Sequence, residues 1–269
     1  MTVPVAASPE ARYSPTGLLR ESIRLMRANP RATILPMAVI QVPLTILIAV
    51  ASFALYATVF SGDPYPTGGI YGVSEMGRPL FAMVLILAVN GLFAFVAQGA
   101  TTIAIAGAAQ GRPTNVSKSL DPAFTRMGSL VGLAIMLIAG TVVLAFSIVG
   151  IALLPFFALR MGLAINALML ENLTPLQALG RSWRLMKGNM FRLLGALILT
   201  GVIVFIPLLI VQTLGLLAAD SGRTTRMIAD TLLSIVDGVI AVPFVVLPIA
   251  VTTLFYLDLK AKNDVRNPS

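Results

Sequence analysis

The sequence contains no cysteine and no histidine among its 269 residues. The lack of cysteine excludes disulfide bonds and thiol nucleophiles, and the lack of histidine excludes imidazole acid–base catalysis and most zinc, haem and copper sites. Charged residues are also scarce, at 11% of the chain, against about 25% in ordinary soluble domains. Because so few polar groups cannot cover a water-exposed surface, we do not expect a soluble enzyme.

Apolar residues take the place of the missing polar ones: they make up 57% of the chain and give a mean hydropathy of +0.92. A transmembrane helix needs about 20 consecutive, mostly apolar residues. Runs of this kind extend over 33–60, 79–107, 129–170, 193–218 and 228–257. The run at 129–170 fits two spans joined by a turn near 149–151, and a re-entrant kink there is the alternative. We therefore predict six transmembrane helices.

The basic residues indicate how these spans are oriented. Five precede the first span, three follow the second, four follow the fourth and three follow the sixth, whereas the other side carries only Arg78, Arg223 and Arg226. Since positively charged loops stay in the cytoplasm, we predict a multi-pass protein of the bacterial plasma membrane with both termini cytoplasmic. The first 31 residues lack the apolar core of a signal peptide, and the outer loops, at about 61–78 and 220–227, are too short for a catalytic domain.

The chain also repeats part of itself. Residues 14–30 (SPTGLLRESIRLMRANP) align without a gap with residues 174–190 (TPLQALGRSWRLMKGNM), with seven identical positions. Each copy begins with a hydroxyl residue followed by proline, which predicts helix starts at Pro15 and Pro175. In the second copy we expect an apolar stripe formed by Leu176, Leu179, Trp183 and Met186. A third, degenerate copy at 115–128 would use Phe124 and Met127 as apolar anchors.

We therefore predict an all-α fold: a polytopic integral membrane bundle of six transmembrane helices, built from three parallel helical-hairpin repeats, each preceded by a cytoplasmic amphipathic helix. This single membrane domain, 1–269, would comprise an N-terminal segment with its amphipathic helix (1–32), hairpin 1 (33–107), an amphipathic segment with hairpin 2 (115–172), an amphipathic helix with hairpin 3 (174–257) and a tail (258–269).

Basic residues on two of the amphipathic helices are expected to face anionic lipid headgroups. They are Arg20, Arg24, Arg27, Arg181, Arg184 and Lys187. Plain anchoring of the bundle and a specific lipid or partner site are both open interpretations of this pattern.

A further pattern runs from the fourth span onward: Arg160, Glu171, 178–188 (ALGRSWRLMKG) and 255–260 (FYLDLK). In these residues the chain resembles the glycerophosphoryl diester phosphodiesterase membrane-domain family, whose members occur beside a catalytic barrel or as stand-alone proteins. The family's tyrosine–aspartate–leucine–arginine ending is altered here, because Leu257 follows the tyrosine and Lys260 replaces the arginine. The resemblance implies a stand-alone membrane module. Because the family's phosphodiesterase activity belongs to the separate barrel and its histidines, the resemblance implies no such activity here.

Polar side chains inside the predicted spans are further candidates for a functional site. Arg160 and Asp237 lie at similar predicted depths, and we expect them to pair across the bundle. With Asn166 and Asn90 they would form an intramembrane polar centre. The alternative is an ion pair that only fixes helix packing. An intramembrane aspartyl enzyme is rejected, because Asp230 and Asp237 are about 10 Å apart along one helix, too far to share a proton.

These patterns together predict a non-enzymatic integral membrane protein, a scaffold or accessory module for a lipid-related or envelope process, with no cofactor and no metal. The alternative function is a small transporter or channel that uses the Arg160–Asp237 centre. Expected partners are anionic membrane lipids on the cytoplasmic side, and a membrane-protein partner or a homo-oligomer is also open. Nucleic acid is not expected, because the net charge of +8 lies on membrane-facing segments.

Overall fold

The computed structural model of the chain describes residues 14–59, 73–112, 115–217 and 223–266. Within these ranges every regular element is a helix, and six helical segments are long and apolar enough to cross a membrane. The predicted all-α, six-span class is therefore confirmed. The predicted outer loops at 61–78 and 220–227 lie partly outside the described residues, as do positions 1–13 and 267–269 of the predicted terminal segments.

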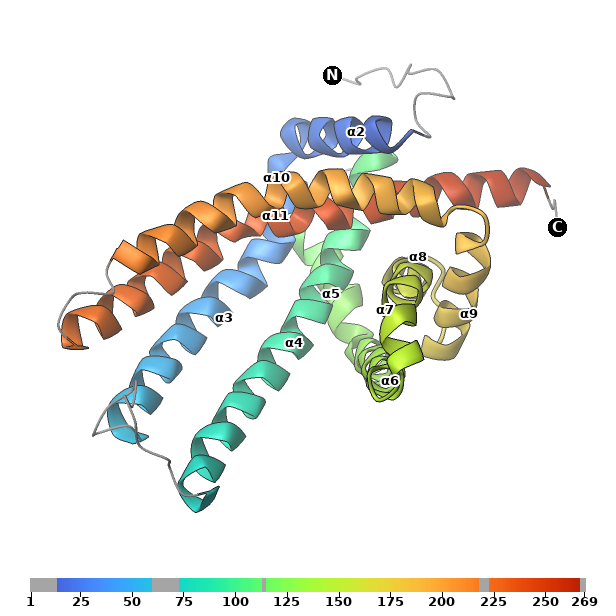
Figure 1. Ribbon diagram of the computed structural model, residues 1–269. Coiled ribbons are helices and arrows are strands. Elements are labelled where there is room, and N and C mark those ends of the chain that lie inside the picture. The colour runs from blue at the N-terminus through green and yellow to red at the C-terminus, as the bar shows by residue number, and fades with distance from the viewer. Residues whose placement is uncertain (1–13, 60–72, 113–114, 218–222, 267–269) are drawn as a thin grey trace.

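A short helix precedes each of three hairpins (Figure 1). Helix α2 (Pro15–Ala28) precedes α3 (Pro30–Val59) and α4 (Val73–Ala109). Helix α5 (Val116–Thr125) precedes α6 (Met127–Ala145), α7 (Ile148–Met161) and α8 (Ala164–Leu170). Helix α9 (Pro175–Met186) precedes α10 (Met190–Leu217) and α11 (Arg223–Arg266). The predicted helix starts at Pro15 and Pro175 are confirmed.

The apolar run at 129–170 is divided at Phe146 and Ser147, slightly before the predicted turn at 149–151. Ser147 caps α7 by accepting a hydrogen bond from the N–H of Gly150. A side chain at Gly150 would collide with the carbonyl oxygen of Leu144. Gly150 thus lies in the first turn of α7, where the backbone of α7 approaches the last turn of α6 closely. It is not part of the link between the two helices. A second break, between Met161 and Ala164, separates α7 from α8 and was not predicted.

The three short helices bury the same positions relative to their N-caps, which are Ser14, Asn115 and Thr174. The buried residues one turn after the cap are Leu18, Ser119 and Ala178, and those one turn later are Ser22, Ala123 and Ser182. Most of these side chains are small, which lets each short helix approach its neighbours closely.

This buried face corrects two sequence predictions. On α9, Leu176 and Trp183 of the expected apolar stripe are exposed, whereas Met186 is buried and Leu179 is partly buried. On α5 the expected anchor Phe124 is exposed, and Ala123 is buried in its place. Hydrophobicity alone placed Trp183 and Phe124 inside, whereas the small neighbours Ser182 and Ala123 are the residues that pack closely against the spans.

Each short helix also packs on the hairpin of a neighbouring unit. Helix α9 contacts α6 and α7, α5 contacts α3 and α4, and α2 contacts α10 and α11. Glycines make two of these approaches close, since a Cβ at Gly132 would touch Pro175 and a Cβ at Gly195 would touch Pro15. Because α2 of the first unit contacts the third unit, the contacts close into a ring. This order favours our interpretation of the chain as three repeats.

The buried core contains residues of all three short helices and of the spans beside them. The tips of the α3–α4 and α10–α11 hairpins lie on the opposite side of the molecule from α9 (Figure 1). Basic residues are exposed on α2 and α9 and just after α9: Arg20, Arg24, Arg27, Arg184 and Lys187. We call the side of the molecule that carries these two helices, away from the tips of the α3–α4 and α10–α11 hairpins, the basic end (Figure 1). At the far ends of the spans large apolar side chains are exposed, among them Leu85, Phe146, Ile148 and Phe205. Such a surface suits the hydrocarbon of a bilayer, where the helices satisfy their own backbone hydrogen bonds.

Candidate functional site

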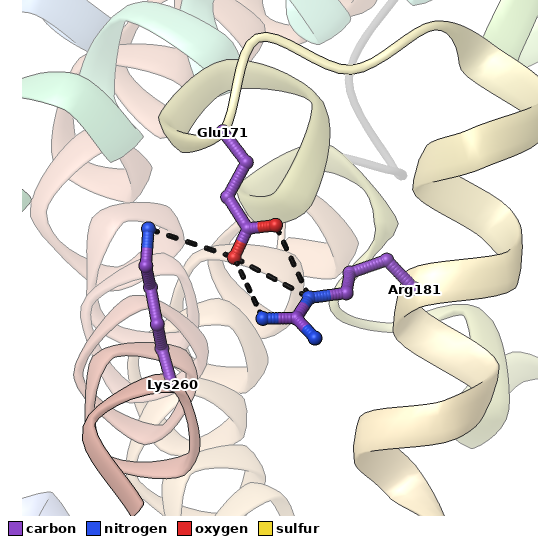
Figure 2. A network of polar contacts seen from close by, with 3 residues as sticks. All are labelled: Glu171, Arg181 and Lys260. Carbon is purple, nitrogen blue, oxygen red and sulfur yellow. Dashed lines mark hydrogen bonds and ion pairs between the residues drawn. The ribbon is translucent and has the colours of Figure 1, made fainter. Parts of the chain in front are cut away.

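A polar cluster at the basic end joins α8, α9 and α11 around one carboxylate (Figure 2). Glu171, the residue after α8, accepts hydrogen bonds at 3.1 Å from Nε of Arg181 to Oε2 and from Nη2 of Arg181 to Oε1. Nζ of Lys260 on α11 lies 3.6 Å from Oε1 of Glu171. We call these three residues the clasp. The Glu171 and Arg181 side chains are only 15% and 18% exposed, so solvent screens their attraction weakly.

The turn between α8 and α9 brings the two main partners together. Asn172 adopts a left-handed backbone conformation with φ of 57°, which asparagine tolerates better than most residues. Thr174 then caps α9, and its own N–H donates to the side chain of Gln177 at 3.1 Å. The chain therefore reverses within a few residues, and Arg181 on α9 faces back toward Glu171.

Positive groups surround the C-terminal end of α8, where the helix dipole is negative. Nη1 of Arg126 donates to the carbonyl oxygen of Leu168 at 3.0 Å. Burial by itself raises the pKa of Glu171, but the buried Tyr256 hydroxyl beside it and the charges of Arg181 and Lys260 outweigh this effect. The pKa of Glu171 therefore lies below its ordinary value, and the carboxylate is ionised at neutral pH.

Ser182 fastens α9 to the break in the fourth span. Its hydroxyl donates to the carbonyl oxygen of Arg160 at 2.7 Å and accepts from the N–H of Leu163 at 3.2 Å. The break between α7 and α8 frees these backbone groups, and unpaired backbone groups are costly inside a membrane. Ser182 is fully buried, so this position of the sequence repeat has a structural role.

Arg160 lies in the last turn of α7, against α9. Its guanidinium carbon is 4.9 Å from the centroid of the Phe156 ring and 4.6 Å from that of Trp183. Its Nη1 donates to the carbonyl oxygen of Trp183 at 3.2 Å. Two aromatic faces and one carbonyl therefore hold this cation where α7 ends.

The intramembrane polar centre predicted from Arg160, Asp237, Asn166 and Asn90 is not assembled. Asn166 accepts from Thr253 at 2.9 Å, and Asn90 accepts from Gln41 at 3.4 Å. Within the described ranges no hydrogen bond or ion pair joins any two of the four predicted residues. The expected Arg160–Asp237 pair is not formed, because the break after α7 leaves Arg160 against α9, whereas Asp237 precedes Gly238, which packs on Thr45 of α3.

The six residues predicted to face headgroups fall into two kinds. Arg20, Arg24, Arg27, Arg184 and Lys187 are exposed on α2, α9 and the residue after α9. Arg181 is instead mostly buried and bonded to Glu171. That Arg181 faces a lipid headgroup therefore stays a prediction, with its Nε and Nη2 already bonded to a carboxylate.

An open hollow of about 480 Å³ lies beside the clasp. Glu171 and Arg181 line it together with Leu173 and Leu176. Gln177, Gly180 and Arg184 of α9 complete the lining. The hollow combines charged and apolar walls, so its chemistry suits an anionic amphiphile better than a purely apolar ligand.

Glu171, Tyr256 and Lys260 are named above only through the family resemblance and are not among the site residues predicted from the sequence. One signal was available: Glu171 is the only acidic residue between Asp121 and Asp220. A single carboxylate between two basic segments is expected to attract the cations on both sides.

Among the described residues no group of three histidine, cysteine, aspartate or glutamate side chains could hold a metal ion. Comparisons with protein-family models, with curated proteins and with solved structures find no match to this chain.

We expect the substitution Glu171→Gln to lower the free energy of unfolding by about 2 kcal/mol at pH 7, because it leaves Arg181 with a neutral partner in a largely buried position. Thermal unfolding in mild detergent, followed by circular dichroism, measures this. Since the pKa of Glu171 is lowered in the fold, its stabilising charge is fully present above the ordinary glutamate pKa. It is lost as the pH falls through the lowered value, so the variant and the parent should converge in acid.

The matched control is Glu21→Gln on α2. Glu21 and Arg24 form an i,i+3 pair at 3.7 Å whose side chains are 32% and 46% exposed. A pair of this kind contributes well under about 1 kcal/mol, so the control should unfold nearly as the parent does. Equal destabilisation by the two substitutions, or a Glu171→Gln effect that persists at acid pH, would contradict a stabilising clasp.

Proposed function

We propose that the chain is a non-enzymatic integral membrane protein that holds anionic lipid headgroups at its basic end. In this role it serves as a scaffold or accessory module for a lipid-related or envelope process. The observation that carries the proposal is the two-sidedness of α2, which buries Leu18, Ser22 and Met26 and exposes Arg20, Arg24 and Arg27. A helix fastened by its apolar face keeps its cations available for anionic headgroups.

The proposal places the basic end, with both termini, on the cytoplasmic side of a bacterial plasma membrane. Its support is the distribution of lysine and arginine, of which only Arg78, Arg223 and Arg226 fall in the opposite segments. Cytoplasmic leaflets carry anionic lipids, so this orientation brings the exposed arginines to the headgroups that attract them.

The proposal also includes kinship with the glycerophosphoryl diester phosphodiesterase membrane-domain family, without the catalytic barrel. Residues that carry the resemblance meet in space: Glu171, Arg181 and Lys260 form the clasp, and Arg160 contacts Trp183. A motif whose scattered parts converge is better explained by a shared fold than by chance similarity of apolar segments.

Orientation can be tested directly, because the chain has no cysteine and single-cysteine variants need no prior replacements. We expect Ser61→Cys to react with a membrane-impermeant maleimide in intact cells and Ser269→Cys to react only in inside-out vesicles. The cysteine-free parent controls for background labelling. Reaction of Ser269→Cys in intact cells would reverse the proposed orientation.

Lipid preference can be read from Trp183, the only tryptophan of the chain, which is 41% exposed on α9. In phosphatidylcholine vesicles, brominated phosphatidylglycerol should quench its fluorescence more than brominated phosphatidylcholine does. The double substitution Arg184→Gln, Lys187→Gln should reduce this preference several-fold, since each charge near an anionic surface contributes about 1 kcal/mol.

The control for this experiment is Arg24→Gln with Arg27→Gln, which removes the same charge from α2 and should leave the preference near Trp183 intact. Raising the salt concentration should weaken the preference of the parent protein, because it screens exposed charges. Equal quenching by the two brominated lipids in the parent protein would refute the proposed lipid-binding role.

A second candidate function, a small transporter or channel, is favoured by one observation. Oε1 of Gln41 and Oδ1 of Asp237 are buried acceptors with no hydrogen-bond donor among the described residues, and they lie on helices α3 and α11, which pack together. Intramembrane carboxylates of this kind often mark ion or proton pathways. For this function, proteoliposomes should show a cation or proton flux that Asp237→Asn abolishes while the melting temperature is kept. No flux above that of empty liposomes would exclude it.

A further inference from the structure

The hollow beside the clasp has features that the plain lipid-anchoring role does not need. It is an open hollow of about 480 Å³ where the α8–α9 turn meets α9. Gly180 of α9 is one of its lining residues, and among the described residues no atom lies within 4 Å of the place where its Cβ would stand. A larger side chain at this position would therefore extend into unfilled space at the hollow.

The charge of the hollow is positive although a carboxylate lines it. Glu171 is bonded to Arg181 and paired with Lys260, so two cations already balance its single charge. Arg184 adds a third positive charge, and its side chain forms no ion pair or hydrogen bond within the described ranges. An anion in the hollow would thus meet an unengaged guanidinium beside one that Glu171 holds in a fixed position.

The arrangement of the two guanidinium groups that line the hollow favours a phosphate group as the ligand. Arg181 and Arg184 are three residues apart on α9, so both lie on the same side of the helix. Nε and Nη2 of Arg181 are directed to Glu171, and the Tyr256 hydroxyl also interacts with this guanidinium. Nη1, which makes no hydrogen bond to Glu171, is the group that a further acceptor would meet. Guanidinium groups bind phosphate oxygens in two-pronged geometry, and a tetrahedral phosphate offers enough oxygens for two arginines.

The apolar wall favours a ligand with a hydrocarbon part. Leu173 and Leu176 line the hollow beside the arginines, and Leu176 is 70% exposed. An exposed leucine next to charged donors can contact an acyl chain or a glycerol backbone while the phosphate remains with the arginines. A phosphate on its own would leave this apolar surface in contact with water.

We infer that this hollow binds the phosphate group of an anionic phospholipid, with Arg181 and Arg184 as ligands and Leu173 and Leu176 contacting its apolar part. The inference rests on the proposed function and deepens it, because it assigns one defined lipid site within a generally basic surface. A free phosphate or a glycerol phosphate shares the recognised group, so the experiment separates these sources from the lipid.

The test fills the hollow without removing a charge. Gly180→Leu places a side chain in the open space, and Gly180→Ala adds only one methyl group. Both substitutions favour the helix, since glycine is a poor helix former. Native mass spectrometry of protein purified with phosphatidylglycerol should find one retained lipid on the parent and on Gly180→Ala, and none on Gly180→Leu. Arg184→Gln should bind this lipid at least about tenfold more weakly, because it loses a charge-assisted hydrogen bond.

The source of the phosphate is identified by competition. Excess inorganic phosphate or glycerol 3-phosphate should leave the retained phosphatidylglycerol in place if the acyl chains contribute to binding. Displacement of the lipid by either soluble compound would instead assign the hollow to a soluble phosphate ligand.

Two results overturn the site: Gly180→Leu retains the lipid as the parent does, or the parent retains none. The quenching of Trp183 then decides the broader question. If brominated phosphatidylglycerol is still preferred, the anionic-lipid function stands without this hollow. If the preference is absent as well, the proposed function fails with it.

Discussion

Glu171 joins three helices at the basic end, because its carboxylate meets Arg181 of α9 and Lys260 of α11 directly after the last turn of α8. The C-terminal end of α8 adds a partial negative charge of its own, and Arg126 donates a hydrogen bond there to the carbonyl oxygen of Leu168. Without the carboxylate, these cations would repel each other in a region that solvent screens poorly. The geometry of α9 relative to the fourth and sixth spans therefore depends on this one acidic residue.

Backbone chemistry adds a second constraint that explains why the short helices bury small residues. The break after α7 frees a carbonyl and an N–H, and Ser182 satisfies both. Only a small hydroxyl side chain can reach both groups while α9 stays close to the span. The same closeness appears at Gly132 and Gly195, which face the prolines that begin α9 and α2. As a result, some bulky side chains of these helices, such as Phe124 and Trp183, are left outside together with the charged Arg184.

The sequence predicted the features that follow from hydrophobic length and helix caps: six spans, and helix starts at Pro15 and Pro175. It failed where packing overrides hydrophobicity, as with Trp183, which is exposed beside a buried Ser182. Periodicity could not locate the break between α7 and α8, because the residues on either side are equally apolar. Nor could spacing along the chain pair Glu171 with Lys260, since that contact depends on how α11 returns to the basic end. The isolated position of Glu171 among basic segments was the one local signal of the clasp.

Arg160 and Arg184 differ in their surroundings, and this difference decides which of them can bind a ligand. Arg160 is flanked by two aromatic rings and bonded to a carbonyl oxygen. Each cation–π contact contributes about 0.5–2 kcal/mol. If Arg160 turned away from the two rings to bind a ligand, the free energy lost would exceed that gained from a surface ion pair. Arg184 forms no such contacts and lines an open hollow. A ligand phosphate would therefore gain from Arg184 without breaking any internal interaction, which makes it the better ligand although it is the less buried of the two.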